Sequence, residues 1–173
     1  MKILLLVLAS LALLVALAWL VGALLPRAHT ATRSLVIRQP AAVLFDTARD
    51  FARHPDWRRD ISAVEILPAD GALARHRETS SHGAITYALR EATPPHRLVT
   101  EIADPALPFG GRWTVEFAPM DGGGTRVRLT EAGFVRPALF RFLARFVFGH
   151  TRTMESYLRQ LAAKFGEAPP VEP

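Results

Sequence analysis

The feature that most constrains this chain is an apolar segment at residues 3–25, directly after Lys2. The segment contains no ionisable side chain and consists mostly of Leu, Ala and Val. A helix of this length reaches roughly 35 Å, at about 1.5 Å per residue, and the hydrocarbon core of a bilayer is about 30 Å thick. The sequence therefore predicts a single-pass transmembrane anchor at residues 1–26, which contacts the membrane through residues 3–25.

A cleaved secretory signal is the alternative, because such signals also place an apolar segment after a basic residue. Their apolar regions normally span only about 7 to 15 residues. The candidate cleavage positions at residues 28–31 also fit the required small-x-small pattern poorly. Both observations favour an anchor that stays in the mature protein.

The charges beside the segment give opposing indications of which side the rest of the chain faces. Lys2 favours a cytoplasmic amino terminus, whereas Arg27, Arg33 and Arg38 favour a cytoplasmic location for the chain after the helix. A very short amino-terminal tail more often stays in the cytoplasm, which gives a weak preference for the extracytoplasmic side. The absence of cysteine is compatible with either redox compartment.

Residues 27–166 are expected to form one domain, because domains most often contain about 100 to 150 residues. Residues 167–173 contain three prolines and two glutamates and are predicted to be a disordered tail. The net charge of +5 comes almost wholly from arginines that mostly alternate with acids, so we expect no nucleic-acid partner. The sequence leaves the oligomeric state open.

The apolar residues after the anchor first recur with a period of two, which is typical of strands with one buried face. A short strand at 34–38, a helix at 39–49 and a helical turn at 50–54 come before the strand-rich region. The further strands that the alternation and the turn residues predict are 61–67, 73–79, 84–92, 97–103, 112–118 and 125–134.

From Pro137 to Phe165 the period changes to about 3.6, which predicts one long helix with a single apolar face. That face needs an apolar partner, and the inner face of the sheet is the only large one. We therefore predict an α+β fold, in which a curved antiparallel sheet wraps around a long carboxy-terminal helix. Gly149 predicts a bend or break in that helix. The predicted face carries Leu139, Leu143, Phe146, His150, Met154, Tyr157, Leu161 and Phe165.

Several short patterns are characteristic, namely IRQPAAVLF at 37–45, HPDWR at 54–58, PPHRLV at 94–99, GGTRV at 123–127 and LFRFLARF at 139–146. With the order of elements, they resemble the SRPBCC (START/Bet v 1-like) superfamily over about residues 32–166. The resemblance is strongest to its bacterial polyketide cyclase/dehydrase-like branch, a label inherited from a few enzymes. It implies the helix-grip fold, with a cavity between the sheet and the carboxy-terminal helix.

The resemblance also implies a hydrophobic small molecule or lipid in that cavity. We expect a membrane-tethered protein that binds or transfers such a ligand, with no cofactor and no metal. Each candidate ligand contact has a plain alternative as a core or rim residue, and a bulge near Gly133 would turn Glu131 towards water. The candidate ligand-binding residues are Trp57, Tyr87, Trp113, Phe117, Glu131, His150 and Met154.

An enzyme is the alternative function, and the sequence does not decide between catalysis and binding. A polyketide cyclase/dehydrase-like reaction would use Glu131 and His150 as acid and base across the cavity. No nucleophile motif, metal-ligand spacing or phosphate-binding loop is present, so hydrolase and nucleotide chemistry are not expected.

Four arginines of the predicted long helix recur at helical spacings. Arg141, Arg145, Arg152 and Arg159 either form an ordinary solvated face or contact anionic lipid, which a membrane tether would favour. The solvated face is the simpler interpretation.

Overall fold

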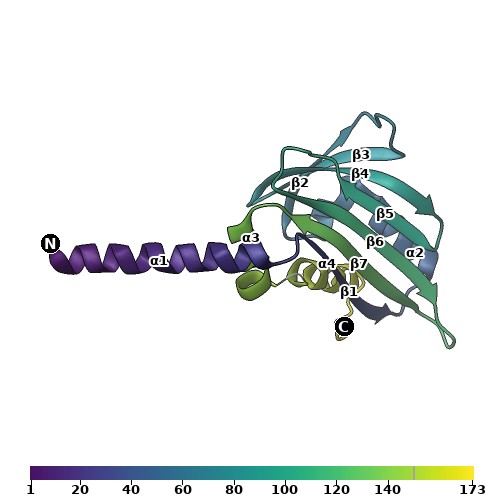
Figure 1. Ribbon diagram of the computed structural model, residues 1–173. Helices are drawn as coiled ribbons and strands as arrows, with labels where there is room; N and C mark the ends of the chain where they lie inside the picture. Colours follow the sequence, from purple (N-terminus) through teal and green to yellow (C-terminus); the bar gives the residue numbers. More distant parts are fainter. Residues whose placement is uncertain (150) are drawn as a thin grey trace.

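The computed structural model describes residues 1–149 and 151–173, the side chain of Phe148 excepted (Figure 1). Seven strands form one antiparallel sheet in the order β1-β7-β6-β5-β4-β3-β2. The strands are β1 (Ala28–Ile37), β2 (Ile61–Leu67), β3 (Ala74–Ser80), β4 (Gly83–Thr93), β5 (Arg97–Ile102), β6 (Phe109–Pro119) and β7 (Thr125–Val135). The helices are α1 (Lys2–Leu24), α2 (Ala41–Arg49), α3 (Ala138–Leu143) and α4 (Arg152–Lys164), with a 3₁₀ helix η1 (Phe51–Asp56) and a π-helical turn η2 (Ala144–Phe148).

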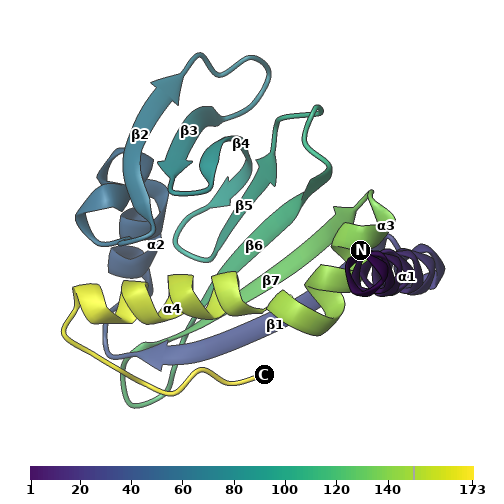
Figure 2. The same cartoon turned by 90° about the vertical axis from the view of Figure 1, so that its left-hand side faces the viewer.

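The hydrophobic core lies between the sheet and the two helices α2 and α4 (Figure 2). Helix α4 buries Met154, Leu158 and Leu161 completely, and α2 adds Phe45, whose ring meets that of Phe117 edge to face at 5.9 Å. Burial of each such side chain contributes about 1.5–3 kcal/mol. The predicted α+β helix-grip architecture is confirmed.

The long carboxy-terminal helix is not one helix, which corrects the expected single apolar face. Gly149 adopts φ +75°, a left-handed conformation that interrupts the helical backbone, so the predicted break near this residue is confirmed. After the break, Met154 and Leu161 are buried against the sheet. Before it, Phe146 is 59% exposed, because α3 and η2 lie beside α1 instead of over the sheet.

Strand β1 begins at Ala28, six residues before the predicted start at Ser34, and pairs with β7 from Ala28 opposite Phe134. Residues 28–33 lack an apolar alternation, so the pairing with β7 determines their conformation. The tail 167–173 is also more ordered than its composition predicts. Ser34 and Glu172 exchange two backbone hydrogen bonds of 3.0 and 2.7 Å, and Glu172 pairs with Arg126 at 2.8 Å. These bonds hold the tail against β1.

Helix α1 projects from the rest of the molecule with its side chains exposed, and its last turn lies beside α3 (Figures 1 and 2). It is long and apolar enough to be a candidate membrane span, although a signal sequence meets the same criteria. At its end, Gly22 lies so close to the backbone of Ala138 that a Cβ atom there would overlap the Ala138 carbonyl. The Arg141 guanidinium is buried, and its Nε donates to the Gly22 carbonyl at 2.8 Å.

We predict that Leu158→Ala lowers the free energy of unfolding by about 2–5 kcal/mol, because it leaves a cavity under α4. Leu73→Ala is the matched control, since Leu73 is 62% exposed. Denaturant unfolding of the full chain in detergent, followed by tryptophan fluorescence, measures both. Equal stability of the two variants would contradict the packing described above.

Candidate functional site

A cavity of about 340 Å³ lies between the sheet and the helices, within the size range of small-molecule sites. Most of its wall is apolar, and the strands β4 to β7 supply most of this wall. The apolar and aromatic lining residues include Phe51, Ile85, Tyr87, Leu98, Ile102, Phe109, Trp113, Val115, Phe134, Val135 and Tyr157. The polar lining residues include His29, His54, Arg58, His76, Glu78, Thr100 and Glu131.

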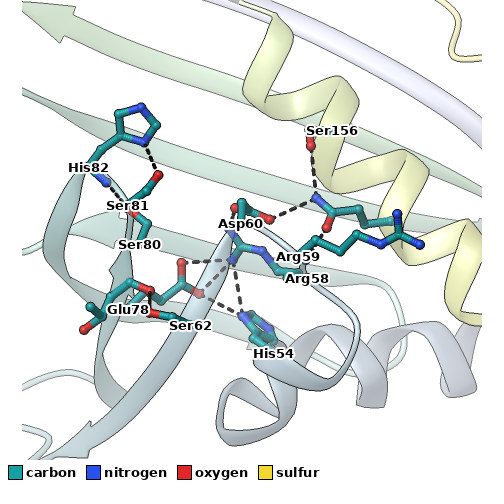
Figure 3. Close-up of polar contacts among 12 residues, drawn as sticks. His54, Arg58, Arg59, Asp60, Ser62, Glu78, Ser80, Ser81, His82 and Ser156 are labelled. Atoms are coloured by element: carbon teal, nitrogen blue, oxygen red, sulfur yellow. Dashed lines mark hydrogen bonds and ion pairs between the residues drawn. The ribbon is translucent and has the colours of Figure 1, made fainter.

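A buried ion pair between Arg58 and Glu78 forms one polar part of the wall (Figure 3). Arg58 Nη1 donates to both carboxylate oxygens of Glu78, at 2.8 and 2.9 Å, and Nη2 donates to Asp60 at 2.7 Å. His54 Nδ1 lies 2.8 Å from Glu78, and its Nε2 lies 3.1 Å from the Ala48 carbonyl. Both ring nitrogens of His54 therefore lie within hydrogen-bond distance of an oxygen acceptor.

The charges of this pair stabilise one another. Burial by itself would raise the pKa of Glu78, but the hydrogen bond with His54, the nearby His76 ring and the charge of Arg58 hold that pKa far below its usual value. Burial would lower the pKa of Arg58, yet the neighbouring Glu78 and Asp60 carboxylates raise it. The ion pair therefore stays charged across the physiological pH range.

His76 presents a polar atom that the fold does not satisfy. Its ring is stacked on Phe51, at 4.0 Å between ring centroids, and on Tyr87 at 5.5 Å. Its Nε2 lies 3.6 Å from Glu78, while its buried Nδ1 has no hydrogen-bond partner among the residues described. Arg58 Nε is likewise buried without a partner in that part of the chain. Such atoms are rare in folded proteins unless a water or a ligand completes them.

A second polar group lies where β1, β6 and β7 adjoin. Glu131 accepts a hydrogen bond from Trp113 Nε1 at 2.7 Å and lies 2.8 Å from His29 Nε2. Its side chain faces the cavity, as the strand alternation predicts, so a bulge does not turn it towards water. Burial, followed by the charge of Glu78, raises the pKa of the nearby Tyr87, so that this phenol stays neutral at physiological pH.

The structure brings three of the seven predicted ligand-binding residues to the cavity wall, namely Tyr87, Trp113 and Glu131. Phe117 and Met154 are core residues instead, 1% and 0% exposed, because they point at the contact between the sheet and α2 or α4. Trp57 is buried behind the wall, where its ring meets that of Tyr157 at 5.5 Å. His150 lies outside the described residues.

The sequence reasoning missed the buried polar cluster. His76 and Glu78 alternate with the half-buried Arg75 and the exposed Arg77 on β3, so the strand has no apolar face that would mark its buried side. The feature that could have identified the buried side of β3 is its pairing with β4, which sets His76 opposite Tyr87. His54 and Arg58 lie within the HPDWR pattern, where only Trp57 was selected. No three His, Asp or Glu side chains in the described part of the chain are placed to hold a metal ion.

A curved antiparallel sheet closed by a carboxy-terminal helix over a lined cavity defines a START-like helix-grip protein. This chain belongs to the family described as polyketide cyclase / dehydrase and lipid transport, whose model matches residues 28–166. No curated protein sequence matches the chain significantly.

Solved structures share the fold at low sequence identity. A START superfamily protein from Mycobacterium smegmatis has a TM-score of 0.61 and 15% identity, covering 79% of this chain and 96% of that one. The Zhui aromatase/cyclase from a Streptomyces species has a TM-score of 0.64 and 15% identity, covering 79% and 93%. A Thermobifida fusca protein has a TM-score of 0.60 and 25% identity, also covering 79% and 93%.

We predict that Glu78→Gln lowers the free energy of unfolding by about 3–5 kcal/mol at neutral pH, because it leaves the buried Arg58 charge poorly compensated. The folded pKa of Glu78 is depressed, so its contribution is fully present above the unfolded pKa of about 4.3 and is lost as the pH falls below it. The difference between the two proteins should therefore shrink in acid.

The control is Glu65→Gln, which removes an exposed partner of Arg77 and should change stability by less than about 1 kcal/mol. Urea unfolding at a series of pH values measures both variants. A pH-independent difference for Glu78→Gln would show that the ionised carboxylate is not what stabilises this region.

Proposed function

We propose that this chain is a membrane-tethered protein that binds or transfers a hydrophobic small molecule or lipid in the cavity between the sheet and α4. The observation that carries the proposal is the combination of a mostly apolar cavity of about 340 Å³ with a buried nitrogen, His76 Nδ1, that has no hydrogen-bond partner among the described residues. A cavity of this kind matches an amphipathic molecule, which has an apolar body and a polar group.

The polar cluster supports one orientation of the ligand. Glu78 lies near Nε2 of His76 and favours the proton on that nitrogen, so Nδ1 is left as an acceptor. A hydroxyl or N–H group of the ligand would donate to Nδ1. The apolar body would then lie along Leu98, Ile102 and Val115.

Helix α1 supports a role at the membrane. A hydrophobic ligand is concentrated in the bilayer, so a tethered binding domain meets it at a much higher local concentration than a free domain does. Lys2 supports an extracytoplasmic domain, whereas the arginines after the helix support the opposite side.

We expect that native mass spectrometry of the full chain, extracted from its host membrane in detergent, detects a retained small molecule as added mass. Val115→Phe fills the cavity and should remove this mass, because Val115 lines the wall. Val36→Phe is the matched control, since Val36 lies on β1 outside the cavity lining. An unmodified mass for the native chain, or equal retention by both variants, would contradict the proposal.

A second variant isolates the polar contact. His76→Phe keeps an aromatic ring between Phe51 and Tyr87 but removes the acceptor, so the retained fraction should fall by roughly an order of magnitude, as for the loss of one buried hydrogen bond. Unchanged retention would place the polar group of the ligand elsewhere in the cavity.

A polyketide cyclase/dehydrase-like enzyme that uses Glu131 and His150 is the second candidate function. The position of Glu131 on the cavity wall and the fold shared with the Zhui aromatase/cyclase favour it. Once a retained molecule is identified, the Glu131→Gln variant tests the idea. Conversion at the native rate would exclude Glu131 as the acid or base, whereas a loss of conversion with intact binding would support catalysis.

A further inference from the structure

The segment after β7 is fixed to the end of the apolar helix by close packing and hydrogen bonds. Gly22 of α1 lets the backbone of Ala138 approach directly, and Arg141 donates to the carbonyls of Gly22 and Ala23 at 2.8 and 3.4 Å. The last carbonyls of a helix have no partner within it, so the buried guanidinium completes the end of α1. Helix α3 and the turn η2 therefore keep a defined position beside the point where α1 ends (Figures 1 and 2).

The same segment exposes three large apolar side chains to solvent. Phe140, Phe146 and Val147 are 47%, 59% and 61% exposed. Phe140 belongs to α3, which packs beside α1, and Phe146 and Val147 follow in η2, which packs on α3. The apolar side chains of α1 are themselves exposed along its length. A cluster of this kind is unfavourable in water and is typical of a segment that lies in the interfacial region of a bilayer.

Three arginines around the segment lack a carboxylate partner. Arg27, Arg136 and Arg145 are exposed, and none of them forms an ion pair with an Asp or Glu in the described part of the chain. Residues 1–45 and 132–154 contain no acidic residue at all. Most other arginines of the chain pair with carboxylates, as Arg97 does with Glu91 and Glu116. Three arginines without a carboxylate partner in the described part of the chain therefore lie where α1 meets the domain, although Arg49 and Arg128, elsewhere in that part, are also exposed and unpaired.

We propose that this junction face docks on an anionic phospholipid bilayer, with its apolar side chains among the upper acyl chains and its arginines against the phosphates. The junction face consists of Arg27, Arg136, Phe140, Arg145, Phe146 and Val147. This inference rests on the tether in the proposed function. It adds a second contact with the bilayer, which sets the orientation of the domain relative to the membrane plane.

The docked orientation brings one end of the cavity to the bilayer. Phe109, Phe134 and Val135 line the cavity at the strand ends nearest α3, with Phe109 paired opposite Val135. A smaller pocket of about 190 Å³, beside the end of α1, shares His29 and Val135 with the large cavity. A ligand entering from the membrane at this end would cross little water before it reached the apolar wall.

The absence of cysteine makes the test direct, because single-cysteine variants of the full chain can be labelled without other changes. The positions are Phe146→Cys and Val147→Cys on the junction face, Leu13→Cys within α1, and Ile66→Cys as the control, since Ile66 is an exposed residue of β2. Each carries an NBD label and is reconstituted in phosphatidylcholine/phosphatidylglycerol vesicles that contain a nitroxide-labelled lipid. Lipid nitroxides quench only labels at membrane depth.

We expect quenching at 146 and 147 several-fold stronger than at 66, together with strong quenching at 13. Quenching at 13 with no excess at 146 and 147 over 66 would overturn the docking while the tether stands. No quenching at 13 would overturn the tether, and this inference with it.

A second experiment tests whether the arginines of the junction face favour anionic lipid. For the labelled Phe146→Cys protein, we expect quenching to increase when phosphatidylglycerol replaces part of the phosphatidylcholine. The further substitutions Arg136→Gln and Arg145→Gln should remove most of this increase. Arg49→Gln/Arg128→Gln is the matched control, because both arginines are exposed and lie away from the junction face. The same loss in both pairs, or in neither, would overturn the role of these arginines.

Discussion

The packing of α4 on the concave face of the sheet is the interaction on which the rest of the structure depends. Met154, Leu158 and Leu161 fill the space over β1 and β7, so the core is solid at that edge. Gly149 interrupts the helical backbone between η2 and α4, so the two do not form one continuous helix. Farther along the sheet the space is not filled, and there the cavity lies between strands β4 to β7 and the α4 residues Thr153 and Tyr157. A continuous straight helix would have brought Phe146 towards the sheet instead of leaving it exposed beside α1.

The buried charges impose a polarity on the cavity. Arg58 and Glu78 compensate one another, so the protein can keep two ions away from water at an acceptable free energy. Beside them, the His76 ring is fixed by stacking but lacks a partner for Nδ1 within the residues described. The junction face lies beside other cavity-lining residues, where Phe134 and Val135 end β7. The proposed polar recognition site and the proposed membrane contact would both serve one cavity, which suits an amphipathic molecule.

The sequence predicts this fold well where a period is strong and poorly where polar residues are buried. Alternation along β6 and β7 correctly places Trp113 and Glu131 on the inner face, and Gly149 correctly marks the helix break. Residues on the inner face of the sheet differ, however, in whether they pack in the core or line the cavity. Periodicity cannot distinguish Phe117, which lies in the core, from Tyr87, which lies on the cavity wall. His76 occupies a buried position that no hydrophobic pattern marks, because its environment is created by strand pairing.

The most direct measurement of the central claim is a crystal structure of the full chain, purified in detergent from its host membrane without added lipid. The account predicts electron density for a small molecule in the cavity, with a polar atom about 3 Å from His76 Nδ1 and an apolar portion against Val115. A cavity closed by its own side chains, or filled only with water, would contradict the claim that this protein holds an amphipathic ligand.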